Sequence, residues 1–269
     1  MFSEYGSKKF SRMKWLNDRF SKRAESAGGE FKMNRVTTIP TSKRTARITG
    51  GLFLLMVVFG LGAEIFFRQT IFNVNDAAAT ASRIVSNDFM YRAGIVSDML
   101  MSLCYFFTAL ALYKLLSSIN KNMAAAMVVF AAAGCVLLLF NVLIEIAPLY
   151  ILSGNDFMSS FNVSQRQSLA MLFYNLYQHG YIIGQIFFSL WVLPLGILIY
   201  KSGFIPKLLG ILFIIETAFG LSAVAVHFLM PAATLETLLS IPMMIAEFSF
   251  LFYLLIRGVN ASKLPVSNA

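Results

Sequence analysis

Six long apolar stretches, separated by short polar segments, dominate the pattern of the chain. They are Ile48–Phe67, Ala93–Leu116, Met123–Ile146, Tyr181–Tyr200, Leu208–Met230 and Leu238–Ile256. A helix of about 20 mostly apolar residues crosses the roughly 30 Å hydrocarbon core of a bilayer. The stretches are continuous, whereas the strands of a transmembrane barrel alternate in polarity. The pattern therefore predicts an all-α fold, a bundle of six transmembrane helices.

Composition makes a water-soluble domain untenable. Of the 269 residues, 58% are hydrophobic and 13% charged, and the mean hydropathy is +0.70. Soluble domains carry about 25% charged residues. The two cysteines, Cys104 and Cys135, both lie in apolar stretches, which excludes a disulfide framework. We therefore predict a multi-pass protein of the cell membrane, with the lipid bilayer as its main partner.

The distribution of Lys and Arg predicts the orientation. Residues 1–47 hold 12 basic and 4 acidic residues, and a net charge of +8 out of +9. With the second and fourth connections and the C-terminus, one side of the membrane receives 18 basic residues, against 4 for the other side. Because basic residues accumulate on the cytoplasmic side, both termini are predicted to be cytoplasmic.

Three regions follow from these boundaries: a basic tail at 1–44, the transmembrane domain at 45–259 and a short C-terminal tail at 260–269. The basic tail contains an apolar arc opposite its cations, formed by Phe10, Met13, Leu16 and Phe20. Such a segment is either an amphipathic helix that contacts anionic lipid headgroups or a solvated tail. It is too short for a folded nucleic-acid reader, so no nucleic-acid partner is predicted.

Several short runs resemble one family of bacterial and archaeal membrane proteins that is catalogued only as a domain of unknown function. The runs are Asp76-Ala-Ala-Ala-Thr-Ala, Tyr91-Arg-Ala-Gly-Ile-Val-Ser-Asp98, Tyr200-Lys-Ser-Gly-Phe-Ile-Pro206 and His227-Phe-Leu-Met-Pro231. Their order and spacing carry the resemblance, which covers about Thr45–Val259. It implies a polytopic helical fold and no particular activity.

Local signals refine the expected helices. Asp76 is expected to cap a short helix on the membrane surface. Ser164 and Gln167 have the spacing of a capping box and predict that the fourth helix begins before its apolar stretch. Gly180 and Gly184 form a small-xxx-small pair that favours close packing against another helix.

Polar residues inside the apolar stretches are the candidate site. An ionisable side chain at mid-bilayer costs at least about 2.5–3.5 kcal/mol, so such residues normally face the bundle interior. We predict a polar pocket, open to the outside and floored by Glu216 and Glu247, in which His179 or His227, or Arg92 if it reaches inward, neutralises one or two of the five acids. The candidate residues are Glu64, Asp98, Asn141, Glu145, Asn175, His179, Glu216, His227 and Glu247. The alternative is that these groups form only interhelical hydrogen bonds.

No P-loop, GxSxG or dinucleotide fingerprint is present, so the sequence does not favour an enzyme. His179 and His227 with two carboxylates could ligate zinc or iron, but they lack the spacing of a known motif, so neither a metal nor a cofactor is predicted. The favoured function is small-solute or proton-linked transport, or ligand binding. The alternatives are a non-catalytic accessory or sensor subunit and a membrane-embedded metal-dependent enzyme. A six-helix chain is small for a transporter acting alone, which leaves room for a homodimer.

Overall fold

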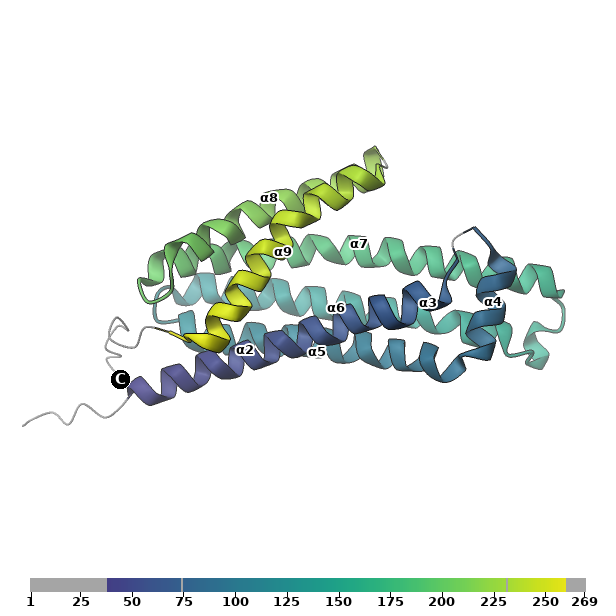
Figure 1. Ribbon diagram of the computed structural model, residues 1–269, viewed down its shortest axis with the longest axis horizontal. Helices are drawn as coiled ribbons and strands as arrows, with labels where there is room; N and C mark the ends of the chain where they lie inside the picture. Colours follow the sequence, from purple (N-terminus) through teal and green to yellow (C-terminus); the bar gives the residue numbers. More distant parts are fainter. Residues whose placement is uncertain (1–37, 74, 231, 260–269) are drawn as a thin grey trace, which may run out of the picture. The chain divides into compact units, whose positions relative to one another are not determined.

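The structure, a computed structural model, describes residues 38–73, 75–230 and 232–259, and the predicted amphipathic segment of the tail lies outside them. Every regular element in these ranges is helical, in the order α2 (Thr38–Gly62), the π-helical turn η1 (Ala63–Arg68), α3 (Gln69–Ile71), α4 (Ala77–Ser86), α5 (Asp88–Leu116), α6 (Lys121–Leu152), the 3-10 turn η2 (Asp156–Met158), α7 (Val163–Ser202), α8 (Lys207–Leu229) and α9 (Ala233–Ile256) (Figure 1).

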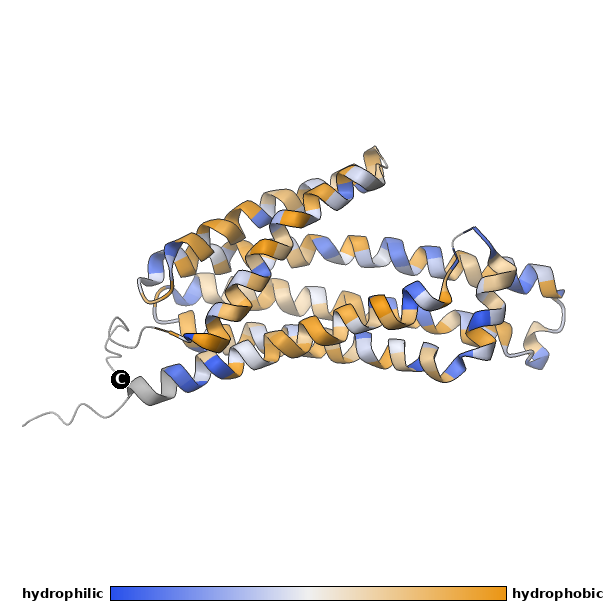
Figure 2. Ribbon diagram, viewed as in Figure 1, coloured by the Kyte–Doolittle hydropathy of each residue, from blue (hydrophilic) through white to orange (hydrophobic). Residues whose placement is uncertain are grey.

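Within the described ranges, six helical segments are long and apolar enough to cross a membrane, and each contains or overlaps one predicted stretch. The all-α, six-span fold is thereby confirmed. Figure 2 shows apolar residues along all of these helices, with hydrophilic residues near the helix ends and also at several places within α7. Large apolar side chains also face outward in mid-helix; on α6, Val136 is 69% and Phe140 66% exposed. Water would penalise such a surface, whereas lipid chains would not.

Helix α7 is much longer than its apolar stretch. Its 40 residues correspond to about 60 Å, twice the thickness of the hydrocarbon core. It does begin before Tyr181, as predicted, but the capping box is formed by Asn162 and Gln165 and not by Ser164 and Gln167. The prediction of that box was wrong by two residues because both pairs have the same spacing. Gly203, in the left-handed conformation with φ of 72°, ends the helix.

The core of the bundle depends on close helix contacts at small residues. A Cβ atom at Gly184 would lie 3.2 Å from the Leu138 side chain on α6, and one at Gly180 would overlap Asn141. The predicted close packing at these two glycines is therefore confirmed. Further along α7, a Cβ at Gly196 would lie 2.7 Å from the carbonyl oxygen of Gly210 on α8, so these two backbones pass in near contact.

Helices α2 and α9, from opposite ends of the sequence, meet at only one end. The rings of Phe53 and Phe250 are 6.2 Å apart, and Gly50 faces Leu254. From this contact α9 runs away from α2 toward its own N-terminus (Figure 1). The candidate pocket is lined by residues of these two helices and of α7.

The segment between α3 and α5 contains the predicted short helix. Asp76 caps α4 by accepting a hydrogen bond from the backbone N–H of Ala79 at 2.8 Å, as predicted. Thr80 adds a second tie, because its hydroxyl donates to the carbonyl of Asn73 and accepts from the Asn73 N–H. Helix α4 packs against α6 and α7, which fixes the end of the first span beside the bundle.

Candidate functional site

A turn of π-helix places a cation inside the bundle. The sequence Ala-Glu-Ile-Phe-Phe-Arg forms η1, which widens the last part of the first span. Single π-helical turns within α-helices are frequent at functional sites, and they rotate the following side chains relative to a regular helix. Arg68 closes this turn and is only 7% exposed.

The Arg68 guanidinium is held by side chains from three elements. Its Nε donates to Glu64 Oε2 one turn earlier, at 2.8 Å. Its Nη1 lies 2.5 Å from Asp98 Oδ2 on α5 and 2.8 Å from the Tyr177 hydroxyl on α7. The same hydroxyl donates to Asp98 Oδ2 at 2.7 Å, which closes a three-membered network. The planar guanidinium group of arginine presents several donors at fixed angles, which suits this arrangement. The ammonium group of a lysine would not.

A third carboxylate lies beside the same cation. Glu145 Oε1 on α6 is 3.7 Å from Arg68 Nη1, and its other oxygen has no hydrogen-bond partner among the described residues. Asn141, one turn earlier on α6, donates to the backbone carbonyl of Tyr177 at 2.9 Å. One guanidinium thus faces three carboxyl groups; its Nε and Nη1 have close partners, and its Nη2 lies 3.5 Å from Asp98 Oδ1. The cluster is therefore a poor receptor for an anion.

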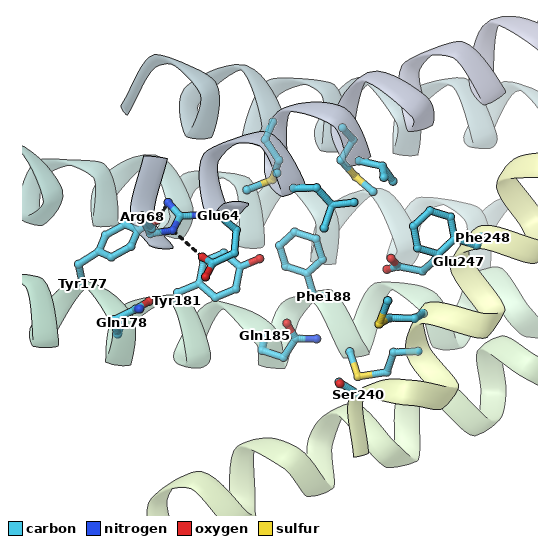
Figure 3. A pocket seen from close by; sticks show the side chains of 17 residues that line it. Glu64, Arg68, Tyr177, Gln178, Tyr181, Gln185, Phe188, Ser240, Glu247 and Phe248 are labelled. Carbon is cyan, nitrogen blue, oxygen red and sulfur yellow. Dashed lines mark hydrogen bonds and ion pairs between the residues drawn. The ribbon is translucent and has the colours of Figure 1, made fainter. Parts of the chain in front are cut away.

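Next to this cluster lies a pocket of about 380 Å³ between α2, α5, α7 and α9 (Figure 3). Its lining is rich in methionine and aromatic side chains. The lining residues are Met56, Val57, Gly60, Leu61, Glu64, Arg68, Met101, Tyr177, Gln178, Tyr181, Gln185, Phe188, Ser240, Met243, Met244, Glu247 and Phe248. Sites for small molecules commonly have about this size and this mixture of apolar surface with a few polar groups.

The polar groups of the pocket are separated along its length. Glu64 and Arg68 lie at one end, and Glu247 lies at the other, near Phe188 and Phe248 (Figure 3). Among the described residues the Glu247 carboxyl group forms no hydrogen bond or ion pair, and its electrostatic neighbours include another acid, Glu216 on α8. A carboxyl group in an apolar wall needs a proton or a cation at that position.

The nine predicted residues divide into separate groups. Glu64, Asp98, Asn141 and Glu145 come together around Arg68 and Tyr177. Of the nine, Glu64 and Glu247 line the pocket. Glu216 is buried on α8 with one carboxyl oxygen unpartnered among the described residues.

The remaining three candidates, Asn175, His179 and His227, are at least partly exposed. Asn175 is exposed and bonds to the backbone of its own helix, at the carbonyl of Met171. His179 and His227 lie together, with ring centroids 5.2 Å apart, and His227 pairs with Glu236 at the start of α9.

The expected role of Arg92 was wrong. Its side chain is 61% exposed and pairs with Asp88 on the same helix at 2.8 Å. The inward cation is Arg68, which sequence reasoning placed in a connection because the apolar stretch ends at Phe67. The spacing of Glu64 and Arg68, four residues apart at the end of a span, was the available signal for an intrahelical ion pair.

Comparison with known proteins identifies the family and assigns no activity. No curated protein and no solved structure matches the chain. Residues 48–258, which contain all of η1 and every residue of the pocket, match the family described as a domain of unknown function, DUF4386. The chain, a six-span membrane-type helical bundle, therefore belongs to the DUF4386 family.

Proposed function

We propose that this protein binds amphipathic organic cations from the bilayer in the pocket between α2, α7 and α9, and carries them in exchange for protons. The observation on which the proposal rests is the unpartnered carboxyl group of Glu247 in a pocket otherwise dominated by methionine and aromatic side chains. A cation with an apolar body satisfies both features, because its charge pairs with the carboxylate while its body contacts the apolar wall.

The charges near the pocket support a cationic ligand over an anionic one. Arg68 is the one basic residue in the pocket lining, and its guanidinium already contacts Glu64, Asp98 and Tyr177. An anion at this position would also lie beside the three carboxyl groups that surround the guanidinium. Aromatic faces such as those of Phe188 and Phe248 also attract organic cations.

The position of the pocket supports access from lipid. Its rim includes Leu61 on α2, which is 43% exposed, and Met244 on α9, which is 52% exposed. Both side chains belong to the divergent parts of helices that meet only near Phe53 and Phe250. Methionine is flexible and polarisable, so a lining with four methionines can adapt to apolar groups of different shape.

Proton exchange follows from the same carboxyl group. An empty pocket leaves Glu247 without a counter-ion, and the neutral acid is then the more favourable form. Binding of a cation favours the carboxylate and releases the proton. If the proton and the organic cation use this site in turn and cross the membrane in opposite directions, the result is proton-linked transport. The basic-residue distribution supports placement in the cell membrane with both termini cytoplasmic.

The test is calorimetric titration of the full chain in lipid nanodiscs with three probes of equal length: octyltrimethylammonium, octanol and octyl sulfate. Empty nanodiscs give the background for partition into lipid. We expect saturable binding of the ammonium probe alone, weakened at least about tenfold in Glu247→Gln, as is typical when an interaction of more than about 1.4 kcal/mol is lost.

Two variants control this experiment. Asp88→Asn removes an exposed carboxylate that does not line the pocket and should leave binding unchanged. Met244→Trp fills the pocket and should weaken binding. Equal binding of the neutral and cationic probes, or full binding by Glu247→Gln, would refute the cation proposal. In proteoliposomes, uptake of the ammonium probe should follow a pH gradient for the native chain and fail for Glu247→Gln.

A further inference from the structure

The structure points to a second site, and we propose that His179 and His227 bind one divalent transition-metal ion such as Zn²⁺ through their Nε2 atoms. His179 comes from α7 and His227 from the last turn of α8, with their ring centroids 5.2 Å apart. This proposal is independent of ligand binding in the pocket, because neither histidine lines it.

Hydrogen bonds fix the ring nitrogens in the form that a metal requires. His179 Nδ1 is 2.7 Å from the backbone carbonyl oxygen of Asn175, which can only accept, so Nδ1 carries the proton. His227 Nδ1 is 3.0 Å from Glu236 Oε2, and a carboxylate likewise accepts. In each neutral imidazole the lone pair is therefore on Nε2.

This pattern is the one found behind metal-binding histidines. Such residues almost always donate their other ring N–H to a backbone carbonyl or a carboxylate, which fixes ring orientation and raises the basicity of the coordinating nitrogen. Asn175 and Glu236 supply one of each kind. The contact of Glu236 with His227 also joins the start of α9 to the end of α8.

The separation of the rings agrees with shared coordination. With Zn–N bonds of about 2.0–2.1 Å and a tetrahedral angle, two imidazoles on one ion have centroids about 5 Å apart. Among the described residues no group of three or more His, Cys, Asp and Glu is arranged to hold a metal. The proposed site therefore uses two histidines and completes its coordination with water, and His179 is exposed enough to admit it.

The composition of the chain makes this proposal easy to test. The only two histidines in the 269 residues are His179 and His227. The experiment uses the full chain without a histidine tag, stripped with a chelator and titrated with Zn²⁺ against a competing indicator. We expect one saturable equivalent, lost in His179→Ala and in His227→Ala, and no comparable binding of Mg²⁺, which prefers oxygen ligands.

Variants of two carboxylates, one beside the histidines and one in the pocket, distinguish this site from the pocket. Glu236→Gln should bind Zn²⁺ about 10–100-fold more weakly, as when a partner of a ligating histidine is lost. Glu247→Gln should bind Zn²⁺ like the native chain. If Glu247→Gln loses the ion while His179→Ala keeps it, the two-histidine site is refuted.

A second measurement needs no substitution. Histidine-selective ¹⁵N labelling gives signals from two residues alone, and before metal addition Nδ1 should carry a proton in both rings. One equivalent of Zn²⁺ should shift both Nε2 signals together. A shift of one signal only, or of neither, would overturn the proposal.

Discussion

Arg68 Nη1 lies 2.5 Å from Asp98 Oδ2, although the two residues are 30 positions apart and belong to different spans. Both side chains are buried, and Tyr177 from α7 bridges them. The contact joins the end of the first span to two helices of the bundle. Four experiments follow from this network, the helix contacts beside it and the predicted orientation.

Arg68→Met should be strongly destabilising. The substitution leaves Asp98, Glu64 and Glu145 without their shared cation, and removal of one partner from a buried pair typically costs about 3–5 kcal/mol. We expect a decrease of this size in the free energy of unfolding in detergent. Arg92→Met removes an exposed ion pair and should leave the unfolding midpoint unchanged. Equal effects of the two variants would contradict a structural role for the buried network.

Tyr177→Phe should have a smaller effect of the same sign. The hydroxyl accepts from Arg68 and donates to Asp98, so its loss leaves charged groups with one hydrogen bond fewer. Such losses cost about 1–3 kcal/mol. Tyr150→Phe is the matched control, because Tyr150 is 59% exposed. The unfolding midpoints of the two variants should differ clearly, and a stable Tyr177→Phe would contradict the network.

Gly180→Ala should destabilise the packing of α6 on α7. The added methyl group would overlap Asn141, and overpacking costs typically about 1–3 kcal/mol. Gly51→Ala is the control, since nothing lies within 4 Å of its Cβ position and alanine favours a helix. In Gly180→Ala with Asn141→Ala the two effects should not add, because the residues are in direct contact. If the decreases in melting temperature of the two single variants add up in the double variant, the methyl group at position 180 does not act through Asn141.

The predicted orientation can be measured by cysteine labelling. With Cys104 and Cys135 replaced by alanine, Ser118→Cys probes the connection after α5 and Ser159→Cys the connection after α6; both serines are exposed. With both termini cytoplasmic, a membrane-impermeant maleimide should label Ser159→Cys in intact cells, and Ser118→Cys only after permeabilisation. The reverse pattern would overturn the orientation and place the two histidines nearer the cytoplasm.

The helical spans were predictable because apolar length is a local property of the sequence. Helix ends were less predictable. Helix α7 begins in a polar segment before its apolar stretch, and apolar length alone does not indicate such a segment. The same effect hid Arg68, which follows the last apolar residue of its stretch but remains within the helical segment that ends at Ile71. The π-helical turn, which orients this side chain, has no strong signature in sequence.

The sequence by itself determined the class of the protein and its number of spans, and it indicated several of the buried polar residues, Asp98, Asn141, Glu145 and Glu216 among them. Those conclusions depend on composition and on the cost of placing charge in lipid, and they need no knowledge of which helices are neighbours. Only the tertiary structure decided the partners: Arg68 with Asp98, His227 with Glu236, and Glu247 with no hydrogen-bond or ion-pair partner among the described residues. Pairing depends on the rotation and order of whole helices, because two side chains share a proton or an ion only when they lie within a few ångströms of each other.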